Sequence, residues 1–368
     1  MLFLLIALST SFLVTLLLVR FESTHRDYSV DRNSNYVHRV SVQRVTRIGG
    51  VGVFFGILLS WCARLFDSAA LAVPVATQGL LLTACVFPTF AAGVLEDLTK
   101  RGWNLVRFAA TLVSAALAGV LLDGWVSRVD MPLLDTFMTV PAIAIVFTCL
   151  AVAGVTNAFN IIDGFNGLAC GVATIILLAI TYVAFKNGDT FVMAAGLTGV
   201  GAILGFMLWN FPRGLIYLGD CGAYLLGFWV AELSVLLVVR NPQVSAWFPL
   251  VLCAYPVFET LFSIYRRTVL RGAHATRPDV AHLHHMIYRR LVRWAVGTRL
   301  PARRTERNSI TSPYLWILTS IAVGPALTFW SHTLALQICA FVFAALYLFG
   351  YARIVRFKVP RWWVIRKS

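Results

Sequence analysis

Charged residues are scarce in this chain of 368 residues, where they make up 13% against 59% for hydrophobic residues. Soluble globular domains carry about 25% charged residues, and the mean hydropathy of +0.78 points the same way. Long polar linkers are also missing, and the apolar runs do not alternate as the strands of a β-barrel do. These absences exclude soluble domains and a barrel, and predict one all-α polytopic transmembrane bundle over residues 1–368.

Cysteine patterns typical of metal sites are missing as well. The seven cysteines are scattered, mostly within apolar runs, and none has the pair spacing of a zinc site. We interpret them as small buried hydrophobic side chains. The run from Met1 to Val19 has no basic segment before it and Arg20 instead of a cleavage site after it, which predicts an anchor helix and not a signal peptide.

Apolar runs that could cross a bilayer recur about eleven times. We expect helices at residues 1–19, 48–65, 79–95, 105–122, 137–155, 168–185, 191–209, 221–239, 246–264, 314–329 and 334–351. In this topology 27 of the 31 Lys and Arg residues fall on one face. The positive-inside rule therefore predicts that this face is cytoplasmic, with the N-terminus outside and the C-terminus inside. The net charge of +15 then reflects topology and attraction to anionic headgroups, and no nucleic-acid partner is expected.

The polar motifs of the chain all fall on this predicted cytoplasmic face. They lie in or beside loops near residues 20–47, 96–104, 156–167, 210–220 and 266–312. The acidic residues of the other face form no comparable motif. We therefore expect the chemistry of the protein at the cytoplasmic face.

The stretch from Asn157 to Leu168 places amides and a carboxylate between two long apolar runs. Such groups are costly to bury unless they are paired or bind a ligand. In a helix, Asn157, Asn160 and Asp163 would share one face, because they recur at every third residue. We interpret them as parts of a ligand site, with an ordinary Asn-Gly or Asp-Gly turn as the alternative.

Two further motifs carry carboxylates at predicted helix ends. Glu96 and Asp97 end one apolar run, just before Lys100, and Gly219 and Asp220 precede another. Mg²⁺ prefers carboxylate oxygens and commonly shares its coordination shell with substrate phosphates. The alternatives are ordinary polarity at a helix end for the first motif and an N-terminal helix cap for Asp220.

Four of the seven histidines lie in the largest predicted loop, at His274, His282, His284 and His285. Their spacing is not specific for zinc. Donors to diphosphate or uridine oxygens suit the acidic motifs better, and a solvated basic loop is the alternative.

Two glutamates lie within predicted spans. An ionisable side chain is expensive in lipid, so Glu259 is a candidate functional group near the cytoplasmic end of its span. Glu232 lies deeper, and we expect it to pack between helices.

Taken in order, the motifs resemble the polyprenyl-phosphate N-acetylhexosamine-1-phosphate transferase family, glycosyltransferase family 4. The resemblance runs through His38, residues 47–50, Glu96–Asp97, residues 157–164, Gly219–Asp220 and residues 282–285. The His-Leu-His-His cluster is similar to that of the undecaprenyl-phosphate N-acetylglucosaminyl 1-phosphate transferase branch. The family usually has paired aspartates where this chain has Glu96 and Asp97.

The resemblance implies a reaction and its participants. A sugar 1-phosphate would pass from a UDP-N-acetylhexosamine, UDP-N-acetylglucosamine being the expected donor, to undecaprenyl phosphate, with release of UMP. Mg²⁺, or Mn²⁺ in its place, would be required. The protein would be multi-pass in the bacterial inner membrane, could form a homodimer, and would start a lipid-linked surface polysaccharide such as O-antigen.

The same resemblance assigns roles to residues. Asp97 and Asp220 would bind the metal, and Asp97, Asp163 and Glu96 would act in catalysis. The substrate-binding set would be Asn157, Asn160, Gly219, His282, His284, His285, Lys100 and Arg47. Two other functions compete with this one: a membrane transporter with polar groups inside its bundle, and a polyprenyl-phosphate-binding homologue with impaired catalysis.

Overall fold

The computed structural model describes residues 2–22, 45–66, 72–270, 272, 281–292 and 304–356. The helices are α1 (Leu2–Arg20), α3 (Gly50–Arg64), α4 (Ala72–Thr99), α5 (Asn104–Leu122), α6 (Pro132–Met138), α7 (Pro141–Ile162), α8 (Leu168–Lys186), α9 (Thr190–Asn210), α10 (Gly219–Arg240), α11 (Trp247–Leu252), α12 (Ala254–Tyr265), η1 (Arg266–Leu270), α13 (Leu283–Ile287), η2 (Tyr288–Val292), α15 (Arg304–Thr328) and α16 (Thr333–Val355). His38, His274 and much of the predicted loops 20–47 and 266–312 lie outside the described residues.

The predicted all-α membrane bundle is confirmed. Within the described residues, nine helices are long and apolar enough to cross a membrane: α1, α4, α5, α7, α8, α9, α10, α15 and α16. Helix α3 is apolar but shorter, with 15 residues. Five of the seven cysteines are buried and two are half-buried, as expected of small hydrophobic side chains.

The single helix predicted over residues 246–264 is wrong. The structure has two helices there, α11 and α12, which meet at Cys253. Pro256 explains the break, because it has no N–H to donate to the carbonyl of Leu252 four residues earlier.

Helices α4 and α7 extend further than the sequence predicts, so the loops near 96–104 and 156–167 are shorter than expected, and α15 begins at Arg304, within the predicted loop 266–312. Helix α4 runs to Thr99, which places Glu96 and Asp97 in its last turns. Helix α7 runs to Ile162, so Asn157 and Asn160 are helical and share a face, as anticipated, whereas Asp163, expected on the same helical face, is the non-helical residue that follows the helix.

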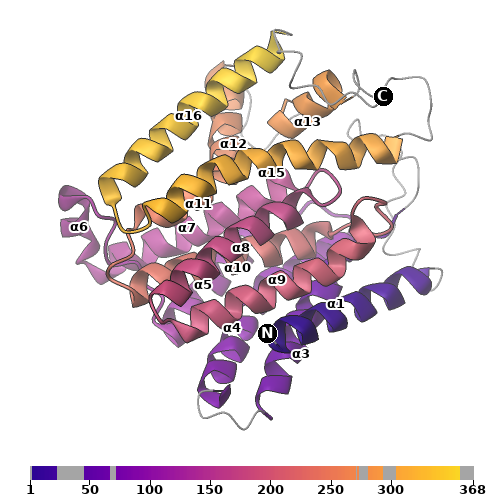
Figure 1. Cartoon of the computed structure of the whole chain (residues 1–368), viewed down its shortest axis with the longest axis horizontal. Helices are drawn as coiled ribbons and strands as arrows, with labels where there is room; N and C mark the ends of the chain where they lie inside the picture. Colours follow the sequence, from indigo (N-terminus) through magenta and orange to yellow (C-terminus); the bar gives the residue numbers. More distant parts are fainter. Residues whose placement is uncertain are drawn as a thin grey trace.

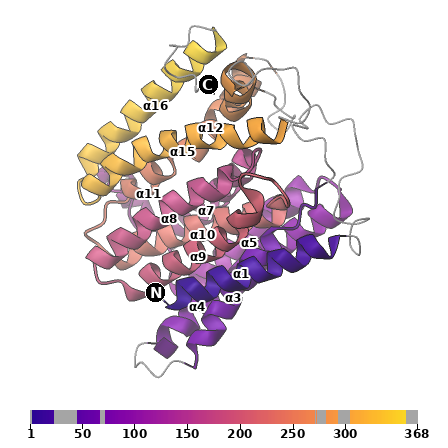
Figure 2. The same ribbon diagram turned by 45° about the vertical axis from the view of Figure 1, so that its right-hand side comes forward.

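Helix α10 occupies the middle of the bundle, with α1 and α3 on one side and α15 and α16 on the other (Figures 1 and 2). In the most apolar 18-residue stretch of each helix, 94% of α10 is buried, against 17% of α1 and 22% of α16. Because α10 is surrounded by other helices, its polar side chains contact protein and not lipid.

All the acidic motifs lie at one end of the bundle, called here the site end. Helices α4 and α7 end there, and α10 begins there, because Asp97 contacts Asp220 and Asn160 contacts the same residue. Helix α10 has 22 residues, so its other end lies about 33 Å away at ~1.5 Å per residue.

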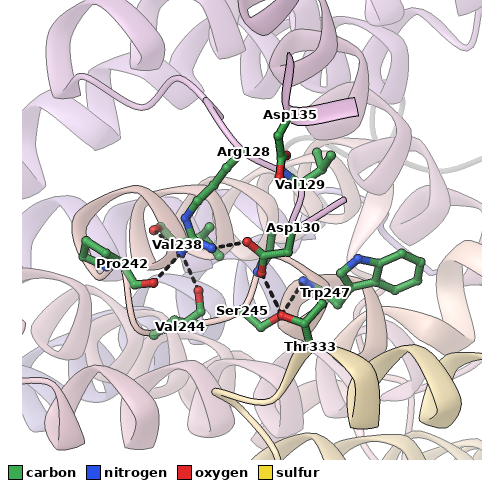
Figure 3. Close-up of polar contacts among 11 residues, drawn as sticks. Arg128, Val129, Asp130, Asp135, Val238, Pro242, Val244, Ser245, Trp247 and Thr333 are labelled. Atoms are coloured by element: carbon green, nitrogen blue, oxygen red, sulfur yellow. Dashed lines mark hydrogen bonds and ion pairs between the residues drawn. The ribbon is translucent and has the colours of Figure 1, made fainter. Parts of the chain in front are cut away.

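A polar network closes the opposite end of the bundle (Figure 3). The carboxylate of Asp130 accepts hydrogen bonds from the Ser245 hydroxyl at 3.0 Å, the Ala246 N–H at 2.7 Å and the Thr333 hydroxyl at 3.1 Å, and it pairs with Arg128. Burial alone would raise the pKa of Asp130, but these hydrogen bonds and the ion pair hold it below its usual value. The network joins the segment after α5, the loop after α10 and the start of α16.

Candidate active site

Four carboxylates from three helices meet at the site end. Glu96 and Asp97 come from α4, Asp163 directly follows α7, and Asp220 lies in the first turn of α10. Asp97 Oδ1 lies 3.0 Å from the backbone nitrogen of Asp220, and Asp163 is within electrostatic range of Asp97 and Asp220. Acidic residues that are up to 124 positions apart in sequence thus form one cluster.

Asp97 caps the start of α10. Its two oxygens accept the N–H groups of Asp220 at 3.0 Å and Cys221 at 2.9 Å, and its side chain is only 3% exposed. The first N–H groups of a helix have no partner within the helix, and a negative charge there is favourable. The cap therefore comes from another helix and not from Asp220, which leaves the Asp220 side chain to face the cluster.

Asn157 and Asn160 link α7 to α10. Asn160 Nδ2 donates to Asp220 Oδ1 at 2.7 Å, and the Tyr224 hydroxyl donates to Asn157 Oδ1 at 2.9 Å. These hydrogen bonds give both amide side chains a partner, which offsets the cost of burying them. The contact with Asp220 places Asn160 in the cluster, and the substrate role assigned to both amides stays a prediction.

Arg107 is a site residue that the sequence analysis did not single out, although it lies within the predicted span 105–122. It lies in α5, is 8% exposed, and pairs with Glu96 at 2.8 Å and with Asp220 at 3.6 Å. Its guanidinium also lies 5.2 Å from the ring centre of Tyr224. The available signal was an arginine inside an otherwise apolar span, where an unpaired charge is unfavourable.

Arg47 lies beside the cluster because backbone hydrogen bonds hold its segment against the residues just before α10. Three hydrogen bonds of 2.8, 2.9 and 3.0 Å join residues 46–50 to residues 217–218, and the positive charge of Arg47 acts on Asp163 and Asp97. Gly219 permits this approach, because it has a φ of +79° and a β-carbon there would lie 1.8 Å from the carbonyl oxygen of Arg47. The structure thus explains why a glycine occupies position 219, and the predicted role of Gly219 in substrate binding stays a prediction.

Lys100 lies at the end of α4. Its ammonium group donates to the backbone carbonyl of Asp97, and its backbone is left-handed with a φ of +59°. The side chain thus lies beside the acidic cluster, and its predicted contact with substrate stays a prediction.

The turn after Asp163 is held by residues that the sequence analysis did not identify. The Asn166 N–H donates to Asn308 Oδ1 at 2.7 Å, the Ser312 hydroxyl donates to the Asn166 carbonyl at 2.6 Å, and the Gly167 N–H donates to Asn210 Oδ1 at 2.6 Å. These partners come from α15 and α9. A cluster of small polar residues at the start of a membrane span was the signal for them.

The three described histidines of the motif lie against this turn. The rings of His282 and His284 stack with centres 5.3 Å apart, and those of His284 and His285 are 4.4 Å apart. His284 Nε2 lies 3.2 Å from the position that a β-carbon on Gly164 would take, and Phe165 contacts the rings of His284 and His285. The histidine motif and the acidic cluster therefore belong to one site.

The carboxylates can be tested for their fit to a metal ion. No group of three His, Cys, Asp or Glu side chains in the described ranges is close enough to form a ready metal centre. Within those ranges the Asp163 carboxylate and Asp220 Oδ2 accept no hydrogen bond, whereas Glu96 is paired with Arg107 and Asp97 caps α10. Four carboxylates near two arginines leave an excess of negative charge, and oxygen donors suit Mg²⁺. Asp163 and Asp220 thus fit a cation best.

Asp163 has an unusual acidity. Burial raises its pKa from 3.8 to about 7; Asp220 and Asp97 contribute to the rise, and Arg47 opposes it. A carboxyl group with such a pKa can exchange a proton, or accept a cation in its place, near neutral pH.

A family model described as glycosyl transferase family 4 matches residues 79–238, which contain all four carboxylates. Over this part of the chain, which is less than half of its length, the protein is similar to glycosyl transferase family 4. The resemblance inferred from the motifs is thereby confirmed.

Proteins similar to this chain come from several bacteria. The probable undecaprenyl-phosphate N-acetylglucosaminyl 1-phosphate transferase of Bacillus subtilis is 28% identical over 263 residues, which cover 70% of this chain and 69% of the relative. The decaprenyl-phosphate N-acetylglucosaminephosphotransferase of Mycobacterium tuberculosis is 27% identical, with 76% and 71% covered. The phospho-N-acetylmuramoyl-pentapeptide-transferase of Mycolicibacterium vanbaalenii is 27% identical, with 87% and 93% covered.

Proposed function

We propose that this protein transfers an N-acetylhexosamine 1-phosphate from a UDP-sugar, with UDP-N-acetylglucosamine as the first candidate, to undecaprenyl phosphate. An oxygen of the lipid phosphate would bond to the sugar-linked phosphorus, the bond from that phosphorus to the bridging oxygen would break, and UMP would leave. The relatives named above act on polyprenyl phosphates or transfer sugar phosphates according to their names.

The convergence of Asp97, Asp163 and Asp220 at one end of a membrane bundle is the observation that carries the proposal. Both substrates are anionic, and one is held in the bilayer, so their phosphates must meet at the membrane surface. A site for them needs cationic groups close to a cation-binding set of carboxylates. Arg47 and Arg107 beside this cluster meet that requirement.

The position of each residue in the site suggests its role in the proposed reaction. Asp163 and Asp220 would hold Mg²⁺, or Mn²⁺ in its place, and a bound ion would supply charge stabilisation to the diphosphate. Asn160 orients Asp220 through the 2.7 Å hydrogen bond, and Asp97 fixes the start of α10 that carries Asp220. The three histidines, which lie against the turn after Asp163, would donate to oxygens of the UDP-sugar. This type of transfer depends mainly on positioning and electrostatics.

The membrane setting follows from the same proposal. We place the site end at the cytoplasmic face of the bacterial inner membrane, because 27 of the 31 Lys and Arg residues belong to segments assigned to that face. The lipid-linked product would start a surface polysaccharide such as O-antigen. A homodimer stays a prediction.

The decisive experiment is an assay of purified protein in detergent with UDP-N-acetylglucosamine, undecaprenyl phosphate and MgCl₂. We expect release of UMP together with a lipid-linked sugar diphosphate, and loss of both when EDTA is added. Asp163→Asn and Asp220→Asn should each abolish release, while Asp123→Asn, at the opposite end of α5, should not. Full activity of both site variants would overturn the proposed roles.

A donor panel completes the test. UDP-N-acetylglucosamine, UDP-N-acetylgalactosamine and UDP-muramoyl-pentapeptide should be compared under the same conditions. We expect the highest kcat/KM with the first, and no UMP from any donor in the panel would refute the transferase proposal.

A further inference from the structure

Glu259 is a fully buried carboxylate outside the acidic cluster. It lies in α12, its side chain is 0% exposed, and three groups from two other parts of the chain converge on it. His282 Nδ1 lies 2.9 Å from Oε1, the Leu283 N–H lies 3.1 and 3.2 Å from the two oxygens, and the Tyr347 hydroxyl donates to Oε2 at 2.8 Å. The buried carboxylate is therefore fully hydrogen-bonded, and its bonds hold residues 282 and 283 and α16 against α12.

The contact with Glu259 determines how His282 is presented. The Glu259 carboxylate accepts hydrogen bonds from Leu283 and Tyr347, and with this side chain as acceptor we assign Nδ1 of His282 as the donor. Nε2 is then the ring nitrogen that remains for another partner, and the orientation of the ring is set. The ring of His284 lies nearly parallel to that of His282, with an interplanar angle of 8° and ring centres 5.3 Å apart, so the orientation of His282 also constrains His284.

Helix α16 holds the same segment at two further points. The Tyr351 hydroxyl donates to the carbonyl of Ala281 at 3.0 Å and accepts from Arg266 at 2.7 Å. Arg290 donates to the carbonyl of Ile354 at 3.2 Å. The C-terminal turns of α16 and the buried face of α12 therefore form the platform on which residues 281–292 rest.

This platform ends at the acidic turn. His284, stacked on His282, lies against Gly164, and Gly164 follows Asp163 directly. A continuous set of contacts thus joins Glu259, His282, His284 and the turn after Asp163.

We propose that Glu259, supported by Tyr347, is a positioning residue that orients His282 and holds residues 281–292 against the Asp163–Gly164 turn, and thereby sets the affinity for the sugar-nucleotide donor. The affinity part rests on the proposed function, in which the histidines contact that donor. Glu259 itself acts only through His282 and the Leu283 backbone.

Three variants test this role. Glu259→Gln keeps the shape of the side chain but replaces one accepting oxygen with an amide that donates. Tyr347→Phe removes one support from the carboxylate and leaves its contacts with residues 282 and 283 in place. Tyr255→Phe is the matched control, because Tyr255 is equally buried in α12 and its hydroxyl has no hydrogen-bond partner in the described residues.

Two measurements separate positioning from general stability. Hydrogen exchange followed by mass spectrometry in detergent should show faster exchange across residues 281–292 in E259Q, less so in Y347F, and no change in Y255F. Kinetic assays should show a KM for the UDP-sugar raised about tenfold in E259Q and a few-fold in Y347F, with a smaller change in kcat. A merely structural defect would reduce the amount of active enzyme, and hence apparent kcat, without changing KM.

The outcomes also distinguish this inference from the proposed function. Wild-type protein that releases no UMP from any donor would overturn the proposed function, and the exchange data would still decide whether Glu259 anchors the segment. Active wild-type protein together with wild-type KM and exchange in E259Q would overturn this inference alone. If E259Q does not fold, Y347F compared with Y255F gives the same decision.

Discussion

Asp97→Asn separates two roles of Asp97 that make opposite predictions for the metal-free protein. As the cap of α10, the carboxylate accepts from two backbone N–H groups in a site that is only 3% exposed. Asparagine keeps one accepting oxygen, so either Asp220 or Cys221 would lose its acceptor and face an amide NH₂. A buried donor left without a partner costs about 1–3 kcal/mol. Loss of the charge at the helix start adds up to about 1 kcal/mol.

A role restricted to cation binding predicts the reverse. Removing one charge from a cluster of four carboxylates relieves the repulsion between Asp97, Asp220 and Asp163. The metal-free variant would then be as stable as the wild type or more stable. The capping role instead predicts a loss of roughly 1–4 kcal/mol, the sum of the two terms above.

Thermal unfolding in detergent with EDTA measures the difference. The chain has 11 tryptophans whose fluorescence reports unfolding. We expect Asp97→Asn to melt several degrees below the wild type. Asp163→Asn is the matched control, because the Asp163 carboxylate accepts no hydrogen bond in the described part of the chain, and it should melt at or slightly above the wild type. Asp97→Asn melting at or above the wild type in EDTA would refute the capping role.

Three further predictions concern the site. Gly219→Ala should abolish activity, because its β-carbon would lie 1.8 Å from a backbone oxygen, whereas Gly102→Ala, with nothing within 4 Å, should keep it in the same UMP assay. Since the pKa of Asp163 is about 7, its carboxyl group is about nine-tenths protonated at pH 6 and about one-tenth at pH 8, so apparent Mg²⁺ affinity should rise about tenfold over this range in calorimetry. Ser312→Ala should lower stability by about 1 kcal/mol and reduce activity, because it removes a buried bond to the turn, whereas Ser320→Ala, exposed on the same helix, should do neither in unfolding and UMP assays.

Each of these has a contradicting result. Wild-type turnover in Gly219→Ala would show that the close approach is dispensable. A pH-independent Mg²⁺ affinity, or the same slope in Asp163→Asn, would remove the link between Asp163 and the cation. Equal behaviour of Ser312→Ala and Ser320→Ala would mean that the turn does not depend on α15.

The sequence predicts much of the fold, because a membrane imposes length and hydrophobicity on each helix locally. Apolar runs of about 20 residues are visible without any tertiary information. The prediction fails over residues 246–264, where Pro256 breaks the helix and hydropathy alone does not register it. It also underestimates α4 and α7, since polar residues at their ends face protein and not lipid.

The sequence by itself determined that the chain is an α-helical membrane protein of a recognisable family, and it identified the acidic and histidine motifs. These features follow from residue type and local spacing. Only the tertiary structure decided that Asp97 caps α10, that Arg107 neutralises Glu96, and that Glu259 anchors His282. Each of these depends on which helix faces which, and a polar group buried in a bundle takes the partner that packing brings to it, whatever the distance along the chain.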